Sequence, residues 1–455
     1  MAHCCVSGAA DGKSWPGAAD GRSWPGAADG KSCPGASCRL LRAKKRGWAS
    51  LRKGKGMATI VEGLTAAQCW TCDRFYGLFF GETVSLEMGN RIPKLRPPLG
   101  NPDTEERAWW LASDRLGVVY EETLAYAEAA ESGMAFKPSK AVIERVLEQG
   151  AGMVDAPIRV MVPNKASRLS AADLTCCLSS TAPAEGSFVR GPGEGLLIAG
   201  PELAVLQLAL KLPMPKLAEL ICELCSTYYY DLAEVPQLSR NEDGLLSRVE
   251  VQECARSNRP VPVSCLRAME WFSAQSASSK AGRAMARAVR YAVDGSASPM
   301  ETALALMLCL PKTAGGYGLP KPQMNRVLPL DAETGRVRVA DLFWPEAKIA
   351  VEYDSDAFHA EKEKLRRDAL RRNQLESQSV TVLTATAEHL SSLAALDELA
   401  GQIARALGRS LHRGRLAAAG ERAALLASLK QRSIEGLRRS AEDFLAARGD
   451  TQRLG

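Results

Sequence analysis

Apolar residues recur along the chain with two different periods, which separate helical from strand-like segments. Spacings of three and four, typical of amphipathic helices, occur at residues 108–116, 139–147, 201–211, 216–225, 262–273 and 279–291. Short runs typical of strands occur at 158–162, 187–189 and 195–198. The first half of the chain therefore indicates a mixed α/β unit, whereas residues 231–260 are polar and irregular and are expected to form a linker.

The pattern is sharper from residue 298 onward. The motif Ser298-Pro-Met-Glu301 combines an N-cap, a proline at the first helical position and an acid in the first turn, so a helix is expected from here to residue 310. Strand-like runs follow at 324–330, 336–343, 348–353 and 380–385, with a charged helix at 361–377 before the last of them. The expected order is α-β-β-β-α-β, and amphipathic helices at 393–407 and 420–447 come after it.

These breaks predict five parts in a chain of the α/β (α+β) class. They are a disordered tail at 1–56, an α/β domain at 57–230, a linker with helices at 231–295, a domain with a mixed sheet at 296–388 and helices at 389–455. The tail holds three copies of a nine-residue repeat, GAADGKSWP in the first copy, and then a basic run. Its Gly and Pro breakers prevent a core, so it is either a nucleic-acid-binding tail or a disordered extension before Met57.

Composition narrows the class of protein without indicating an activity. The 455 residues are 46% hydrophobic and 24% charged, as in globular proteins, and no apolar run reaches the ~20 residues of a membrane span. A signal-peptide core is also missing, so the cytoplasm is the expected location and no membrane partner is expected. Residues 1–56 hold 11 Lys/Arg and three Asp, and the rest hold 47 basic and 49 acidic groups, so the net charge of +6 does not itself predict nucleic-acid binding.

Cysteine usage favours free thiols. The chain has 13 cysteines, an odd number, and no sign of an oxidising compartment. Two CxxC pairs, Cys69/Cys72 and Cys222/Cys225, could supply four zinc ligands, but about 150 residues separate them. We interpret them as buried thiols.

Carboxylates gather where the predicted strands end. Asp341 closes one run, Glu352 and Asp354 close the next, and His359 follows. An unpaired buried charge is costly, so such acids need a partner, and several carboxylates at neighbouring strand ends suit a divalent cation. Residues 352 and 354 lie two apart, so their side chains face the same side of a strand. A histidine has an ordinary pKa of about 6.5, which suits proton transfer.

This constellation resembles the PD-(D/E)xK nuclease superfamily, and within it the small endonuclease-like domains related to very-short-patch-repair enzymes. The resemblance covers about residues 296–388. It rests on the order α-β-β-β-α-β and on Ser298-Pro-Met-Glu301, Leu319-Pro-Lys-Pro-Gln323, Ala340-Asp-Leu-Phe-Trp-Pro345, Val351-Glu-Tyr-Asp-Ser-Asp-Ala-Phe-His359 and Asp368-Ala-Leu-Arg-Arg-Asn373. It implies a restriction-endonuclease-like core.

The resemblance also implies roles for the acids. Asp341 and Glu352 would bind Mg²⁺ (or Mn²⁺) near the scissile phosphate, and Glu301 would complete or orient that site. Asp354 stands where the superfamily's lysine usually sits, and would add a metal ligand or position water. All-oxygen ligands suit Mg²⁺, and phosphodiester hydrolysis needs a Lewis acid and an activated water.

The remaining positions of the resemblance concern proton transfer and nucleic-acid contact. His359 would act as a general acid/base or as a phosphate contact. Asp368, with Arg371 or Arg372, would brace the site or touch the DNA backbone.

A basic stripe lies upstream of this domain. Lys280, Arg283, Arg287 and Arg290 recur at spacings of three and four and therefore share one helix face. Such a face is either simply solvated or contacts the DNA backbone, and Arg283 and Arg287 are the candidates for that contact.

Three functions of different classes remain open from the sequence. The first is a Mg²⁺-dependent endonuclease acting on DNA. The second is a non-catalytic DNA-binding regulator that keeps a nuclease-like domain, because residues 188–210 are similar to abortive-infection antitoxin-like regulators. The third is an interaction protein built on the C-terminal helices.

Overall fold

The computed structural model describes residues 58–71, 120–135, 137–150, 154, 156–179, 187–191, 194–240, 246–258, 262–331, 336–354, 380–411 and 419–430. Residues 57–455 form one compact unit, and the tail predicted at 1–56 lies outside the described residues. The described ranges hold ten α-helices and eleven strands, and both larger sheets mix parallel with antiparallel pairs. The mixed α/β class expected from the sequence is therefore confirmed.

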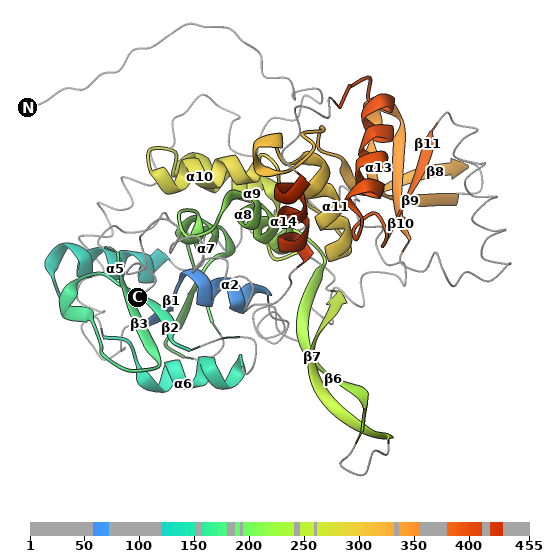
Figure 1. Ribbon diagram of the computed structural model, residues 1–455. Coiled ribbons are helices and arrows are strands. Elements are labelled where there is room, and N and C mark those ends of the chain that lie inside the picture. The colour runs from blue at the N-terminus through green and yellow to red at the C-terminus, as the bar shows by residue number, and fades with distance from the viewer. Residues whose placement is uncertain are drawn as a thin grey trace, which may run out of the picture. The chain divides into compact units, whose positions relative to one another are not determined.

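The first sheet has five strands in the order β3-β2-β1-β5-β4 (Figure 1). Their bounds are β1 Thr59–Val61, β2 Ile158–Val162, β3 Leu174–Leu178, β4 Phe188–Arg190 and β5 Leu196–Ala199. β1 runs parallel to β5 and antiparallel to β2, while β2 pairs in parallel with β3 and β4 pairs antiparallel with β5. The three strands predicted in this region are confirmed. Every residue of β1, β2 and β5 is buried, which explains their nearly continuous apolar sequence.

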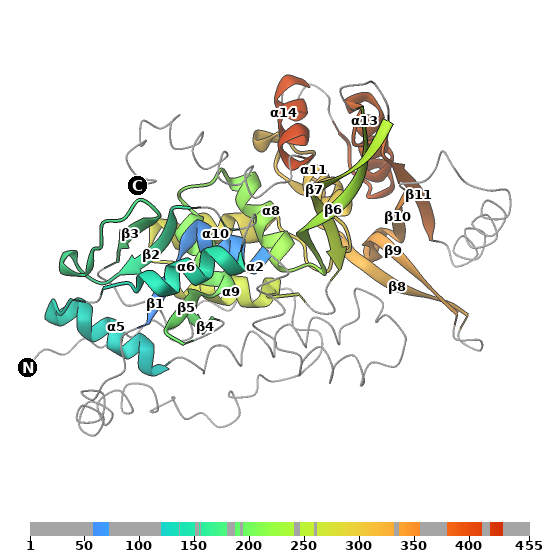
Figure 2. The same ribbon diagram turned by 90° about the horizontal axis from the view of Figure 1, so that it is seen from below.

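Helices lie beside this sheet and between it and the second large sheet (Figures 1 and 2). Their bounds are α2 Gly63–Thr71, α5 Tyr120–Ser132, α6 Lys140–Gln149, α7 Pro201–Leu208, α8 Met214–Leu224, α9 Leu266–Gln275, α10 Lys280–Val289, α11 Pro299–Cys309, α13 Leu393–Ala406 and α14 Ala419–Lys430. Most predicted helices agree with these within a few residues. The helix predicted at 108–116 and the part of the last predicted helix at 431–447 lie outside the described residues. Ser139 precedes α6 as expected, but its side chain makes no capping hydrogen bond; its N–H donates to Thr59 Oγ1 at 2.8 Å.

Residues 231–260 are not an irregular linker, so that prediction was wrong. β6 (Tyr228–Arg240) and β7 (Leu246–Asn258) form a long antiparallel hairpin that pairs from Tyr228↔Asn258 to Arg240↔Leu246. Among the described strands, these two pair only with each other, and their polar composition with Pro236 hid the strand signal. In Figure 1 the hairpin extends downward, away from the helices.

The second large sheet has four strands in the order β11-β10-β9-β8. Their bounds are β8 Gln323–Asp331, β9 Arg336–Trp344, β10 Ile349–Asp354 and β11 Thr381–Thr386. β8, β9 and β10 form an antiparallel meander, and β11 pairs in parallel with β10. The four predicted strands are confirmed with α11 before them, and the predicted helix at 361–377 lies outside the described residues.

A continuous hydrophobic core joins both sheets through the helices. It includes Ile198 of β5, Leu220 of α8, and Leu342 and Val351 of β9 and β10. Helix α11 lies at its centre, since all residues from Glu301 to Cys309 are buried, and α11 contacts α8, α14 and β9. An apolar helix surrounded on all sides is the expected result of its uniformly apolar sequence.

The cysteines that the structure describes are free thiols, and five of them are buried: Cys69, Cys222, Cys225, Cys265 and Cys309. Burial raises the pKa of Cys222 to about 12, so this thiol stays protonated at neutral pH. The interpretation of the CxxC cysteines as buried thiols is confirmed for Cys69, Cys222 and Cys225, and Cys72 lies outside the described residues. None of the helices described here combines the length and apolar character that a membrane crossing requires.

The packing of α11 predicts the cost of a core truncation. Leu306 is fully buried, so Leu306→Ala should lower the free energy of unfolding by about 2–5 kcal/mol in urea titrations. Met134 is 51% exposed, and Met134→Ala should change it by less than about 0.5 kcal/mol. Equal effects of the two substitutions would contradict the central position of α11.

Candidate active site

The candidate site begins with a capping box at the start of α11. Ser298 has extended backbone angles, and its Oγ accepts the Glu301 N–H at 3.2 Å and donates to Glu301 Oε1 at 2.7 Å. The Ala297 N–H donates to Glu301 Oε2 at 2.9 Å. These local bonds hold a buried carboxylate in one orientation, as the Ser-Pro-Met-Glu motif predicts.

Asn325 adds a further bond to this carboxylate from β8. Its Nδ2 donates to Glu301 Oε2 at 2.7 Å and to the Gly295 carbonyl oxygen at 3.0 Å. Its φ is +47°, in the left-handed region that asparagine tolerates better than most residues. The pairs Met324↔Leu342 and Arg326↔Ala340 flank it, which places Asn325 opposite Asp341 of β9.

Asp341 lies where β9 and β10 stop pairing. Their ladder ends at Val351↔Leu342, and the Tyr353 N–H of β10 donates to Asp341 Oδ2 at 2.6 Å. The carboxylate therefore takes the place of a backbone acceptor at the point where the strands separate. Beyond this fork, Glu352 and Asp354 continue the parallel pairing with β11.

The register of β9 and β10 ends one pair before Asp341 and Glu352, which brings these two residues next to each other, and the charge of Glu352 acts on Asp341. Two neighbouring carboxylates repel each other when both are ionised. The site therefore brings two carboxylates together from neighbouring strands, with Glu301 nearby on α11.

The electrostatics of Asp341 reflect this crowding. Burial, and then the negative charges of Glu301 and Glu352, raise its pKa to about 7, against the lowering effects of the Tyr353 N–H and the Arg338 guanidinium. A carboxyl group with this pKa is about half protonated at neutral pH. Perturbed acids of this kind are more frequent at functional sites than elsewhere, although ion-pair networks also produce them.

Arg338, a residue of β9 that the sequence pattern did not single out, neutralises Glu352. Its Nε donates to Glu352 Oε1 and its Nη2 donates to Glu352 Oε2, a two-pronged pair that is mostly buried. Among the described residues, its buried Nη1 has no hydrogen-bond partner. A buried guanidinium nitrogen without a partner costs free energy, so Arg338 retains an unused NH2 group beside the carboxylates.

The end of β10 lies opposite the end of β11, and a histidine, His389, follows β11 in the chain. Asp354 is opposite Thr386 of β11, and the Thr386 N–H donates to His389 Nδ1 at 3.0 Å. With Nδ1 accepting, the neutral ring carries its proton on Nε2. His389 was not among the predicted site residues, because nothing in its local sequence marks it.

The predicted residues divide into three groups. The structure brings Glu301, Asp341 and Glu352 together, and it places Asp354 at the end of the same strand as Glu352. Arg283 and Arg287 lie on the exposed face of α10. Four predicted residues lie outside the described residues: His359, Asp368, Arg371 and Arg372.

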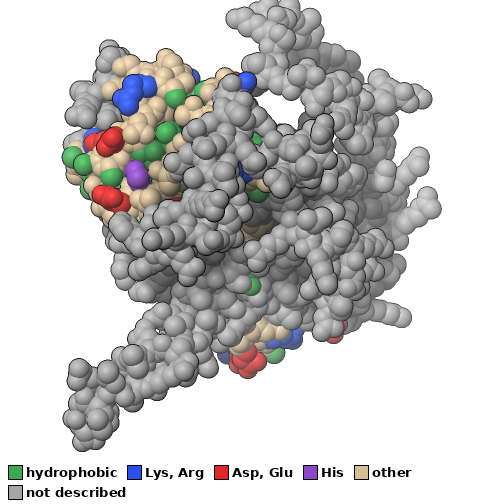
Figure 3. Space-filling view, turned by 90° about the vertical axis from the view of Figure 1, so that its right-hand side faces the viewer, with side chains coloured by type: hydrophobic (Ala, Val, Ile, Leu, Met, Phe, Trp, Pro, Cys, Tyr) green, Lys and Arg blue, Asp and Glu red, His purple; other side chains and the backbone are tan. Residues whose placement is uncertain are grey.

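In the part of the chain that the structure describes, no group of three or more His, Cys, Asp or Glu side chains is arranged to hold a metal ion. On the face shown in Figure 3, the coloured acidic, basic and hydrophobic side chains are intermixed, so this face offers no large area of one charge among them. Comparisons with protein-family models, with curated proteins and with solved structures find no significant match.

The role of Asn325 can be measured by two substitutions. Asn325→Gly keeps a left-handed backbone but leaves Glu301 with one donor fewer, and it should lower the free energy of unfolding by about 1–3 kcal/mol. Asn325→Ala should cost about 1 kcal/mol more, because alanine disfavours a positive φ. Urea titrations measure both, and equal losses would show that the backbone angle is not constrained.

The raised pKa of Asp341 predicts a pH dependence. The folded state binds this proton more tightly than the unfolded chain, whose aspartate pKa is near 3.8, so the stabilisation is complete below about pH 4 and is lost as the pH rises to about 7. In EDTA, Asp341→Asn should therefore gain stability relative to wild type between pH 4 and pH 8. Val337→Ala, which changes no ionisable group, controls for the rest of the chain. A constant difference between Asp341→Asn and wild type would contradict the assigned shift.

Proposed function

We propose that the protein is a metal-dependent endonuclease that hydrolyses DNA phosphodiester bonds at Asp341 and Glu352. One observation carries this proposal: two carboxylates meet at the fork of β9 and β10, with a third on α11 close enough to raise the pKa of Asp341. Carboxylates crowded together in this way gain most from a divalent cation, because it removes their mutual repulsion.

The sheet around the site supports the proposal. An apolar helix, an antiparallel meander of three strands and a fourth strand parallel to the third follow the order of the PD-(D/E)xK core that the sequence resembles. The resemblance assigns metal binding to Asp341 and Glu352, which lie within β9 and β10.

The donor set fits Mg²⁺ or Mn²⁺ in part. Mg²⁺ commonly uses one or two protein carboxylates and completes its coordination with water and substrate phosphate oxygens, so a pair of acids is enough. Asp341 and Glu352 would hold the ion. Asp354, two residues after Glu352 at the end of β10, could supply a further oxygen ligand. A bound cation would compete with the Arg338 guanidinium for the oxygens of Glu352.

The residues of the chain have separate tasks in this reaction. The ion, when bound, would act as a Lewis acid on a phosphate oxygen. Glu301 is held in place by hydrogen bonds from Ser298 and Asn325, and its negative charge raises the pKa of Asp341. Arg338 carries an unused N–H that is suited to a phosphate oxygen once Glu352 is engaged elsewhere. In the net reaction, water adds across one P–O bond, which leaves a phosphate monoester on one fragment and a hydroxyl group on the other.

A second function is favoured by the same arginine. Because Arg338 already neutralises Glu352, the fold could retain the site without binding a metal ion, as in a non-catalytic DNA-binding or antitoxin-like regulator. In that case DNA would bind with a strong salt dependence and would not be cleaved.

Cleavage assays on the full chain separate these functions. With plasmid and oligonucleotide substrates in Mg²⁺ or Mn²⁺, Asp341→Ala and Glu352→Ala should each reduce cleavage by at least about 100-fold, since metal ligands matter at least as much as the residues that orient them. Glu346→Ala removes an exposed carboxylate from the turn between β9 and β10 and should retain wild-type activity.

Cleavage that survives in both Asp341→Ala and Glu352→Ala would place the chemistry elsewhere. Salt-sensitive DNA binding by wild type with no cleavage in either metal would favour the regulator.

A further inference from the structure

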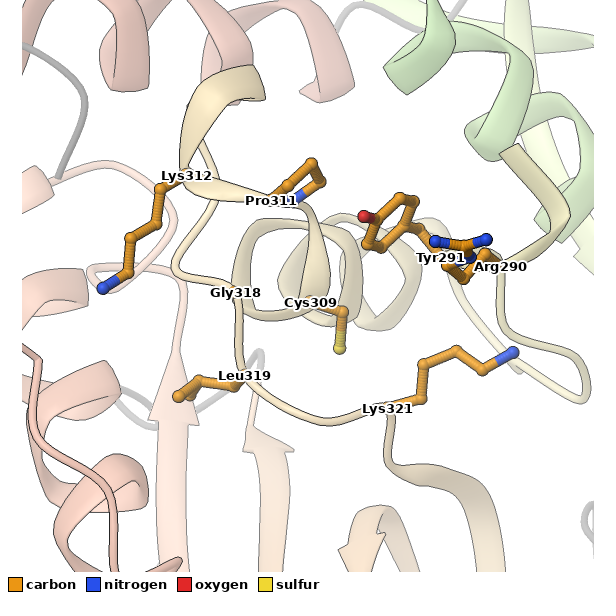
Figure 4. Close-up of a pocket in the computed structure, with 8 residues that line it drawn as sticks. All are labelled: Arg290, Tyr291, Cys309, Pro311, Lys312, Gly318, Leu319 and Lys321. Carbon is orange, nitrogen blue, oxygen red and sulfur yellow. The ribbon is translucent and has the colours of Figure 1, made fainter. Parts of the chain in front are cut away.

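A basic pocket lies at the C-terminal end of α11, whereas Glu301 of the candidate site lies at the start of this helix, and the pocket has no part in the hydrolysis described above. Its volume is about 410 Å³, and its lining includes Arg290, Tyr291, Lys312, Leu319 and Lys321 (Figure 4). Three of these side chains are cations and none is an acid. Among the described residues, no carboxylate lies within ion-pair distance of any of the three cations.

The wall of this pocket is fixed by the backbone. After α11, the chain turns back so that the N–H groups of Tyr317, Gly318 and Leu319 donate to carbonyl oxygens of the last turns of α11, at 2.8–2.9 Å. Gly316 permits this turn, because a Cβ there would lie 2.1 Å from the Leu310 carbonyl oxygen. The lining residues of this loop are therefore held in place before any ligand arrives.

The opposite side of the pocket positions its cations. Lys321 Nζ donates to the Ala292 carbonyl oxygen at 2.9 Å, which holds the ammonium against the chain that leaves α10. Arg290 and Tyr291 come from that same stretch, so Arg290 and Lys321 line the same pocket from two segments (Figure 4). Lys321 retains two further N–H donors, and Arg290 retains its five. Two neighbouring cations without a carboxylate are suited to an anion, and a phosphate group accepts from both.

The pocket is also connected to a longer basic surface. Lys280, Arg283, Arg287 and Arg290 are all exposed and share one face of α10, which confirms the predicted stripe as a surface feature. The stripe extends about 15 Å along the helix from Lys280 to Arg290, where the pocket begins.

The spacing from pocket to candidate site fits one nucleic-acid strand. Lys321 precedes Asn325 by four residues of extended chain, which spans at most about 14 Å. Asn325 lies opposite Asp341. Neighbouring strands lie about 5 Å apart, so Lys321 and Asp341 are at most about 19 Å apart. Phosphates of one DNA strand advance about 3.4 Å each along the helix axis, so the pocket is within about six nucleotides of Asp341.

We propose that the pocket binds a single backbone phosphate of DNA through Arg290 and Lys321, within about six nucleotides of the phosphate at Asp341. This assignment rests on the DNA-binding part of the proposed function and not on hydrolysis. The basic face of α10 then follows the same backbone away from the site.

The test measures DNA binding in EDTA, where no cleavage occurs, by the full chain carrying Arg290→Gln together with Lys321→Gln. Losing one phosphate contact should lower the slope of log Kd against log salt concentration by about 0.9. Lys137→Gln, at an exposed lysine in the loop before α6, should leave the slope unchanged. Unchanged thermal unfolding of each variant shows that the fold is retained.

A phosphate-by-phosphate comparison makes the test specific. Duplexes with one neutral methylphosphonate at successive positions should include a position where neutralisation weakens binding to wild type but not to the double variant. We call this difference between wild type and the double variant coupling. If no position shows coupling, or if the double variant and Lys137→Gln have equal slopes, the proposal that the pocket binds a phosphate is wrong.

Two further outcomes separate the pocket from the hydrolytic function and from other phosphate sources. Coupling in EDTA without cleavage in Mg²⁺ would support phosphate binding at the pocket and contradict the proposed hydrolysis. Cleavage without coupling would support the hydrolysis and contradict phosphate binding at the pocket. Inorganic phosphate that raises the Tm of wild type but not of the double variant, with equal DNA slopes, would assign the pocket to a free phosphate compound and overturn our proposal.

Discussion

The buried carboxylate of Glu301 is the constraint on which the candidate site depends. It accepts bonds from the Ser298 hydroxyl, the Ala297 N–H and the Asn325 amide, so one charged group joins the start of α11 to β8. A buried charge persists only when such donors surround it. Removing a donor would weaken both the helix start and the helix–sheet connection, because the same oxygens serve both.

The fixed charge of Glu301 has a consequence for the neighbouring acids. Burial raises the pKa of Asp341, and Glu301 and Glu352, which cannot move away from it, help to bring that pKa to about 7. The strand fork makes this arrangement possible, since the Tyr353 N–H that a continuous ladder would use is given to the carboxylate. The site therefore lowers stability at neutral pH, which is typical of residues kept for binding or catalysis.

Local patterns in the sequence predicted most of the helices and strands, and they also predicted the capping box, because Ser298 and Glu301 are three residues apart and act on each other. The site could be predicted only as far as its acids. Arg338 and Glu352 are 14 residues apart, and Asn325 meets Glu301 from another element, so their pairing depends on the sheet register. The hairpin at 228–258 was missed because its strands pair with each other and carry no core-facing pattern.

A chain whose residues 57–455 carry no excess of basic groups can still bind a polyanion if its cations are separated from its acids. The carboxylates at the fork repel phosphate, whereas Arg290, Lys312 and Lys321 attract it. The Debye length at physiological ionic strength is about 8 Å, so salt weakens the effect of each group on the other. Phosphate affinity is then supplied by the pocket and α10, while the acids remain available for a cation. At low ionic strength the Debye length grows to about 30 Å, and the same acids would weaken phosphate binding at the pocket.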